Sequence, residues 1–298
     1  RQIFIYEQLG YTLPQFAHLP YVAEPGSKHK LSKRKLDKYL KNRDFAQLKQ
    51  HGETIAARLK VPVDGETFNP VIVDFYEQIG FLPDALLNYL LLLGWSLDDR
   101  TEEFTREEML QHFSLERVGK GPASFDPQKL VSFQDRAMQQ LPSKQKVALV
   151  LPFLQKAGLV SEPPPCDTGP CLLQIVEATG DRLKVAGDIL DYDDFFVADD
   201  DLSYDEKTVE KRLRKPEGAA ELLSEFRNLL AEASEFDATA LETLLKSFVA
   251  AKEIQIGRIV HVLRAAVTGK SVGFGIFDTL AILGQERCLR RIDRCLSL

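Results

Sequence analysis

Signals that start and stop helices recur along the sequence, and they limit the chain to a mainly α-helical fold. Pro83 opens an apolar run that Gly94 closes, which matches the preference for Pro at the first helical position and for Gly just past the last. The pair Asp126-Pro127 is a helix start of the same kind. Residues 105–108 and 203–206 fit the capping box, in which a hydroxyl and a carboxylate satisfy unpaired backbone amides.

Hydrophobic periodicity favours the same fold class. Strand signals are few and short, and residues 71–73 (Val-Ile-Val) are one example. Residues 161–170 include Pro163, Pro164, Pro165 and Pro170, which cannot lie in a helix interior and predict a junction between two helical bundles. One buried helix face is predicted by apolar residues at helical spacing: Leu241, Leu244, Leu245, Phe248 and Val249.

Charge is distributed unevenly along the chain. Lys and Arg total 38 against 44 Asp and Glu, for a net charge of −6, which argues against a general nucleic-acid coat protein. Residues 28–60 nevertheless carry eleven basic residues against three acidic ones. Residues 188–206 carry nine acids and no Lys or Arg, a block typical of a solvated face. The last helix, near residues 285–296, has an ordinary amphipathic pattern, and we expect no RNA contact from its arginines.

Cysteine usage and apolar run length exclude two further classes. The four cysteines form no CxxC pair, and no further ligands stand at the usual zinc spacings, so we expect reduced thiols and no metal site. The longest apolar run, residues 85–95, is shorter than the roughly 20 residues that a membrane-spanning helix needs. We therefore expect no membrane association.

The sharpest short motif is Lys30-Leu31-Ser32-Lys33-Arg34, which follows the Pro25-Gly26 turn. Small, polar and cationic residues after such a turn can fold over a polyphosphate. The ammonium groups would neutralise the charge that develops as pyrophosphate leaves, while Ser32 and backbone amides hold phosphate oxygens. Taken alone, the pentapeptide also fits a solvated surface loop.

Its context resembles a known family. Ala-His-Leu-Pro at 17–20, the Pro-Gly turn and the pentapeptide resemble the end of the catalytic domain of bacterial glutamyl-tRNA synthetase, with the pentapeptide in place of the class I KMSKS signature. Gly-Phe-Leu-Pro-Asp-Ala-Leu-Leu-Asn-Tyr-Leu at 80–90 is similar to the same family. Further matches follow in order at residues 93–96, 104–105, 113–118, 125–130, 263–269 and 283–287.

The resemblance implies a mainly α chain of three parts. Residues 1–35 would be a remnant of the catalytic domain with its KMSKS-like loop, residues 36–130 a helical stem-contact region, and residues 131–298 a helical-bundle anticodon-binding domain whose sub-bundles join near 161–170. The implied activity is ATP-dependent attachment of glutamate to tRNA-Glu by a cytoplasmic, monomeric protein. Its full form would use ATP and Mg²⁺, and no cofactor is expected on this chain.

Site residues follow from the same resemblance. Lys33 would contact the ATP phosphates, and Lys30, Ser32 and Arg34 would shape the mobile loop. Arg182 matches an arginine that reads the third anticodon base; pairing with the acidic stretch after Asp188 is the alternative. Two further anticodon-loop candidates are Arg264 and Phe274, the latter stacking on a base, with a core aromatic as the alternative.

Two departures from the family leave alternatives open. Residues 36–71 are predicted to be an insertion of one or two helices, which would contact tRNA phosphates or form a solvated hairpin. Nothing resembles the His-Ile-Gly-His signature, and the sequence starts at Arg1 without Met, so we expect a C-terminal portion that binds tRNA without catalysing alone. A non-discriminating synthetase that also charges tRNA-Gln and a stand-alone, non-catalytic tRNA-binding module are the alternatives.

Overall fold

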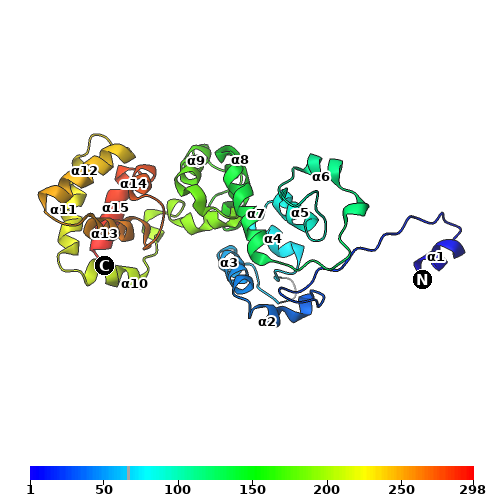
Figure 1. The fold of residues 1–298 in the computed structure, drawn as a ribbon. Helices are drawn as coiled ribbons and strands as arrows, with labels where there is room; N and C mark the ends of the chain where they lie inside the picture. The colour runs from blue at the N-terminus through cyan, green and yellow to red at the C-terminus, as the bar shows by residue number, and fades with distance from the viewer. Residues whose placement is uncertain (66–67) are drawn as a thin grey trace. The chain divides into compact units, whose positions relative to one another are not determined.

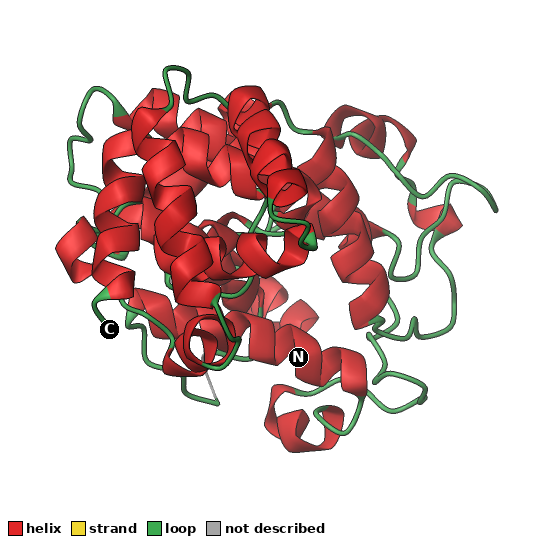
Figure 2. Cartoon of the chain, turned by 90° about the vertical axis from the view of Figure 1, so that its left-hand side faces the viewer, coloured by secondary structure: helices red, strands yellow, loops and turns green. Residues whose placement is uncertain are grey.

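Nearly all regular structure in residues 1–65 and 68–298, which the computed structural model describes, is helical (Figure 2). Within these residues the only β-type pairings are isolated bridges, from Ala23 to Lys30 and Ser124, and from Trp95 to Val118. The mainly α fold class is therefore confirmed. The strand signal at 71–73 is wrong, because the Ile72 N–H donates to the Asn69 carbonyl at 2.8 Å in a turn, and a helix starts at Val73.

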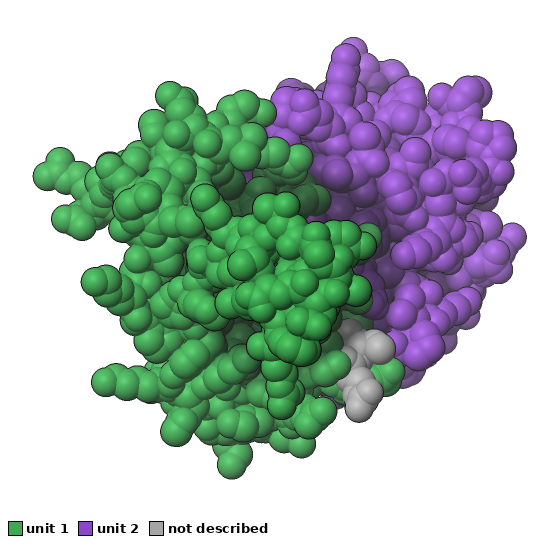
Figure 3. Space-filling model, turned by 90° about the vertical axis from the view of Figure 1, so that its right-hand side faces the viewer, with its two compact units in different colours: residues 1–51, 64–77, 82–134 green, residues 52–63, 78–81, 135–298 purple. Residues whose placement is uncertain are grey.

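The chain divides into two compact units (Figure 3). Unit 1 comprises residues 1–51, 64–77 and 82–134, and unit 2 comprises residues 52–63, 78–81 and 135–298. The domain boundaries expected at residues 35 and 130, and the junction at 161–170, stay predictions. None of the described helices is long and apolar enough to cross a membrane.

Unit 1 is built from short helices (Figure 1), and α5 and α6 start at the predicted local signals. Pro83 occupies the first turn of α5, and the predicted capping box starts α6, with the Glu108 N–H donating to Thr105 Oγ1 at 3.2 Å and the Thr105 N–H to Glu108 Oε2 at 2.7 Å. The helices of unit 1 are α1 (Gln2–Gln8), η1 (Lys33–Lys35), α2 (Leu36–Tyr39), α5 (Pro83–Leu91), α6 (Arg106–His112) and η2 (Leu115–Arg117). The unit boundary falls within α3 (Arg43–Leu59), α4 (Val73–Ile79) and α7 (Pro127–Gln140).

The segment predicted as an insertion, residues 36–71, forms α2 and α3, and its residues 66–67 lie outside the described residues. Lys41 and Arg43 are exposed, as the pattern predicts. The Phe45 ring packs on Phe125 at 5.5 Å between centroids, in the core of unit 1. The predicted apolar face is largely buried: Leu36, Tyr39, Phe45, Leu48, Ile55 and Leu59. Whether this segment is an insertion stays a prediction.

Unit 2 is a set of longer helices that bury their apolar faces on one another. Helix α8 (Ser143–Lys156) packs on α9 (Thr168–Thr179) and on η4 (Ala186–Phe195), and α11 (Ala219–Glu232) packs on α13 (Ile256–Thr268) and α15 (Gln285–Leu296). Helix α12 (Ala238–Ala251), which packs on α14 (Ile276–Leu283), carries the predicted stripe and buries Leu241, Leu245 and Phe248. The remaining short elements are η3 (Gly180–Arg182), η5 (Asp199–Asp201), α10 (Glu206–Val209) and the single π turn η6 (Glu210–Arg214).

The capping box predicted at 203–206 is wrong, because α10 starts two residues later. Asp205 is the N-cap, and its Oδ2 accepts a hydrogen bond from the Thr208 N–H at 3.0 Å. The Asp205 N–H donates to the Gly269 carbonyl at 3.0 Å. Gly269 has a φ of +72°, and an added Cβ would lie 2.0 Å from the Ser203 carbonyl oxygen. This tertiary contact, which local sequence does not reveal, decides where α10 begins.

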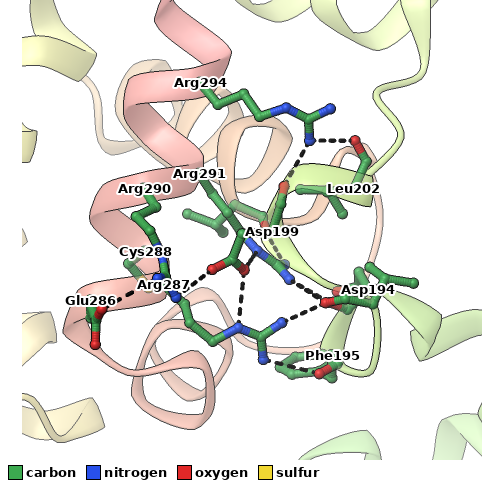
Figure 4. Close-up of polar contacts among 12 residues, drawn as sticks. Asp194, Phe195, Asp199, Leu202, Glu286, Arg287, Cys288, Arg290, Arg291 and Arg294 are labelled. Atoms are coloured by element: carbon green, nitrogen blue, oxygen red, sulfur yellow. Dashed lines mark hydrogen bonds and ion pairs between the residues drawn. The ribbon is translucent and has the colours of Figure 1, made fainter. Parts of the chain in front are cut away.

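The solvated face predicted for residues 188–206 is also wrong in part. Asp188 and Asp194 are 7% and 4% exposed. Asp199 binds arginines of α15 (Figure 4), and Arg291 is fully buried, donating to Asp199 Oδ1 at 2.7 Å, to the Val267 carbonyl at 2.7 Å and to the Asp194 carbonyl at 2.8 Å. Burial alone would raise the pKa of Asp199, but the hydrogen bonds from Arg291 and Arg287 hold that pKa below its ordinary value.

Candidate nucleic-acid interface

The pentapeptide at 30–34 lies on the surface of unit 1. Lys30, Lys33 and Arg34 are exposed, while Leu31 and Ser32 are half-buried. Among the described residues, none of the three cations forms an ion pair or a side-chain hydrogen bond. The loop therefore presents three positive charges to any anion that approaches it.

Backbone hydrogen bonds give the loop a defined base. The Glu24 N–H donates to the His29 carbonyl at 2.8 Å, and the Leu31 N–H donates to the Val22 carbonyl at 2.9 Å. Gly26 turns the chain with a φ of +65°, a conformation that costs glycine little. The Ala23 N–H and carbonyl pair with residues 123 and 125, so the turn is tied to the segment that leads into α7.

Glu24 anchors the residues that follow the pentapeptide. Its carboxylate accepts hydrogen bonds from Lys38, from Lys35 at 3.0 Å and from Tyr39 Oη at 3.3 Å. The hydrogen bonds from Lys38 and Lys35 lower the pKa of Glu24 to about 2. The carboxylate is only 2% exposed, so the ion pairs hold a side chain that has left bulk water.

Two further contacts fix the backbone of the pentapeptide itself. The Ser32 N–H donates to Tyr39 Oη at 3.0 Å, and Asn69 Nδ2 donates to the Lys33 carbonyl at 3.0 Å. Asn69 is fully buried. The backbone is thus held while the cationic side chains extend into solvent, an arrangement suited to polyphosphate oxygens. Sequence reasoning missed Glu24 and Asn69, because no periodic pattern connects them to the loop.

In unit 2, Arg182 stands at the end of η3 with an exposed side chain. Its only side-chain hydrogen bond among the described residues is a long one, from Nη1 to the Thr179 carbonyl at 3.4 Å. The acidic stretch takes other partners: Lys270 binds Asp194 Oδ1 at 2.6 Å, and Arg58 binds Asp191 Oδ1 at 3.0 Å. Within the described part of the chain, Arg182 therefore does not pair with the acidic stretch.

Arg264, on α13, points a buried donor at no acceptor. Its Nη1 atom is fully buried and has no hydrogen-bond partner within the described part of the chain. Burial lowers the pKa of Arg264, and the positive charge of Arg182 lowers it further. Gly273 leaves room for the buried Nη1 atom of Arg264, because an added Cβ at residue 273 would come within 2.9 Å of that atom. Arg264 as a whole is half-buried, so a ligand would meet the accessible part of its guanidinium and not Nη1.

Phe274 belongs to the core of unit 2. Its ring is 2% exposed and stacks on Phe195 with 5.4 Å between centroids and 14° between planes. Tyr192 covers it at 5.4 Å. A base could not reach either face of this ring, so the core alternative describes it and the stacking role does not. Of the three anticodon-loop candidates, Arg182 is exposed, Arg264 is half-buried and Phe274 lies in the core.

Within residues 1–65 and 68–298, no group of three or more His, Cys, Asp or Glu side chains could hold a metal ion. The four cysteines carry free thiols, and burial raises the pKa of Cys288 to about 12 and that of Cys295 to about 11. These two thiols are therefore protonated and act as small core residues.

Comparisons with known families divide the chain at nearly the same place as its two units. Residues 145–296, just over half of the chain, match the family described as the anticodon binding domain. Residues 68–132 match the family described as the catalytic domain of class I tRNA synthetases (E and Q). Arg182 and Arg264 both fall within the first of these matches.

Known proteins are similar to this chain along nearly its whole length. A glutamate–tRNA ligase of Moorella thermoacetica is 34% identical over 294 residues, which cover 99% of this chain and 53% of the relative. A glutamate–tRNA ligase of Desulforudis audaxviator is 34% identical over 299 residues, covering 100% and 52%. The crystal structure of a glutamate tRNA ligase from Elizabethkingia meningosepticum superposes with a TM-score of 0.71 at 26% identity, covering 99% of this chain and 54% of that one. The chain thus spans about half the length of the relatives it matches.

Proposed function

Because the chain belongs to the anticodon-binding-domain family, we propose that it binds the anticodon arm of a tRNA and serves a ligase that attaches glutamate to tRNA-Glu. The observation that carries this proposal is the Arg182–Arg264 pair, which lies within the matched region. There Arg264 has a buried guanidinium donor without an acceptor, Arg182 is exposed with one long hydrogen bond, and the charge of Arg182 lowers the pKa of Arg264. Planar guanidinium forks suit the paired acceptors on a base edge.

In the proposal, Arg182 reads the third anticodon base and Arg264 contacts a neighbouring nucleotide of the loop. Both residues lie on backbone that packing holds in place. Arg182 ends η3, which directly follows α9. Leu263 and Ala265, which flank Arg264, are buried. A loop base whose Watson–Crick edge offers two adjacent acceptors to these forks would bind better than one whose edge offers donors there. This is the physical basis for separating glutamate from glutamine tRNAs, whose anticodons differ at that base.

The loop at 30–34 supplies the second half of the proposal. Lys33, with Lys30, Ser32 and Arg34, would contact the phosphates of ATP and offset the charge that builds up as pyrophosphate leaves. The exposed, unpaired state of the three cations supports this role. Mg²⁺ would accompany ATP in the whole enzyme. The described residues offer no cluster of carboxylates that could hold this ion.

Activation of glutamate by this chain alone is not expected. The catalytic-domain family matches only residues 68–132, and the sequence contains nothing similar to the His-Ile-Gly-His signature. We propose a monomeric chain that works in the cytoplasm, where free thiols such as those of its four cysteines are the usual state.

Binding of the whole chain to tRNAs for glutamate, glutamine and aspartate tests the proposal. We expect tRNA-Glu to bind most tightly. Equal binding of tRNA-Glu and tRNA-Gln would favour the non-discriminating alternative, and equal binding of all three would contradict reading of the anticodon. Glutamate-dependent pyrophosphate exchange should be undetectable; measurable exchange would refute the expectation that the chain is inactive alone.

A further inference from the structure

A second group of basic residues in unit 2 surrounds a surface hollow that the Arg182–Arg264 pair does not occupy. The hollow has a volume of about 320 Å³, and we call it the basic hollow. No acidic side chain lines it. Its polar lining comes from η6 and from the start of α13: Lys211, Arg212, Gln255, Gly257, Arg258 and His261.

The cations of the basic hollow are largely uncommitted. Among the described residues, Lys211 and Arg212 form no ion pair, whereas Arg214 on the same π turn binds Glu206 Oε1 at 2.6 Å. Arg258 donates Nη2 to the Glu217 carbonyl at 2.8 Å, which orients the guanidinium without neutralising its charge. Three positive charges and one imidazole therefore converge on a space that contains no counter-charge.

The first turn of α13 adds backbone donors to the same space. This 13-residue helix begins after Gln255 without a side-chain cap. Gly257 leaves the turn uncovered, and an added Cβ there would lie 3.8 Å from the His261 ring. Unpaired amides and the helix dipole at such an end favour an anion. They add to the side-chain cluster, which is the main feature of the basic hollow.

The basic hollow and Arg264 of the proposed base-reading pair share helix α13. His261 and Arg264 lie three residues apart on α13 and therefore face the same side of the helix. Burial lowers the pKa of His261, and the charges of Arg212, Arg264 and Lys211 lower it further. The positive charge of Arg182 likewise lowers the pKa of Arg264.

We propose that the basic hollow binds a phosphate group of the tRNA backbone, next to the nucleotides that Arg182 and Arg264 contact. This inference rests on the proposed function, because the ligand is the same RNA. The hollow contributes affinity and register for every tRNA equally, since a phosphate carries no base identity. Lys211 and Arg212 neutralise the phosphate, while Arg258, His261 and the α13 amides supply hydrogen bonds.

The test compares two double variants of the whole chain, Lys211→Ala with Arg212→Ala, and Lys144→Ala with Lys246→Ala. The second pair removes the same charge from exposed sites on α8 and α12 of the same unit. Affinity for tRNA-Glu and tRNA-Gln is measured against salt concentration. Loss of one phosphate contact should flatten the logarithmic salt slope by about 0.7–0.9, and should weaken both tRNAs by the same factor. The control pair should leave the slope unchanged.

A second measurement needs no substitution in the basic hollow. In the unaltered chain, the pKa of His261, followed by NMR, should rise when tRNA-Glu is added, because a phosphate would favour the imidazolium. An unchanged slope in the Lys211/Arg212 variant, an equal loss in the control pair, or a constant His261 pKa would overturn the inference while leaving the proposed function intact. Failure of the unaltered chain to bind any tRNA would overturn both.

Discussion

The loop at 30–34 and helix α15 are both rich in basic residues, and the structure uses them in opposite ways. In α15, Arg287 donates to Asp199 Oδ1 at 3.0 Å and to the carbonyls of Phe195 and Val197, and Arg294 donates to the carbonyls of Asp199 and Leu202 (Figure 4). In the loop, Lys30, Lys33 and Arg34 are exposed without such partners. The α15 arginines hold the fold of unit 2, and the loop cations are available to a ligand.

The comparison shows that the number of basic residues does not locate a binding site. What distinguishes the two regions is whether the guanidinium and ammonium groups have protein acceptors. By this criterion Arg264, with its buried and unpartnered Nη1, belongs with the loop, although it lies in the same unit as α15. A charged group that the fold leaves unsatisfied is costly to bury, so Arg264 does not serve the fold as the α15 arginines do.

The largest expected effect is on stability. Arg291→Ala should lower the free energy of unfolding by about 3–5 kcal/mol, because it removes the one fully buried arginine of the three that bind Asp199 and leaves two buried carbonyls without this donor. Urea unfolding followed by circular dichroism measures the loss. Arg290→Ala is the matched control, since Arg290 binds Asp199 from an exposed position and its removal should cost at most about 1 kcal/mol. Equal losses would contradict the distinction between the buried and exposed arginines.

The next effect concerns recognition. Arg182→Ala should reduce discrimination between tRNA-Glu and tRNA-Gln by about 1–3 kcal/mol, measured as the ratio of their dissociation constants. Stability should change little, because the exposed side chain makes one long hydrogen bond. Arg182→Lys tests the geometry, since an ammonium keeps the charge but cannot form two parallel hydrogen bonds. A variant with unchanged preference would remove Arg182 from the base-reading role.

A smaller effect should appear in the pH dependence of stability. The folded pKa of Glu24, about 2, lies below the ordinary value, so its ion pairs stabilise the fold above about pH 4.5, and this contribution is lost as the pH falls toward 2. Glu24→Gln should therefore unfold more readily than the unaltered chain at neutral pH, and the difference should shrink in acid. Denaturant titrations at several pH values measure it. A difference that stays constant with pH would show that Lys35 and Lys38 do not depend on the charge of Glu24.

The smallest effect is expected at the loop cations. Lys33→Ala should change the free energy of unfolding by no more than about 0.5 kcal/mol, because the side chain is exposed and contacts no protein acceptor. Thermal or urea unfolding measures it alongside Arg291→Ala. A loss comparable with that of Arg291→Ala would mean that the loop cations are structural after all.

Helix starts encoded by neighbouring residues could be predicted from the sequence. Thr105 pairs with Glu108, and Asp126 caps the Lys129 N–H at 3.0 Å. The residues of each pair are only three positions apart, so the motif and the structure agree. The start of α10 was mispredicted at Ser203 because Gly269, 66 residues later, fixes the backbone there. Local signals fail where a tertiary contact sets the boundary.

In the candidate site, too, some features could be predicted from the sequence, whereas those set by distant residues could not. Exposure of Lys30, Lys33 and Arg34 follows from composition, and the resemblance placed Arg182 and Arg264 in one domain. The role of Glu24 was not predictable, because its partners are 11 and 14 residues away and share no helix face with it. The amphipathic pattern of α15 suggested outward arginines, yet Arg291 is buried because Asp199, 92 residues earlier, supplies a carboxylate inside unit 2.

The most direct test of the central claim is titration of the whole chain with the isolated anticodon stem-loop of tRNA-Glu, using an acceptor-stem minihelix of the same tRNA for comparison. We predict saturable binding of the stem-loop that Arg264→Ala weakens, because the half-buried guanidinium of Arg264 is then lost as a donor to the RNA. Absence of stem-loop binding, or binding that Arg264→Ala leaves unchanged, would contradict the account.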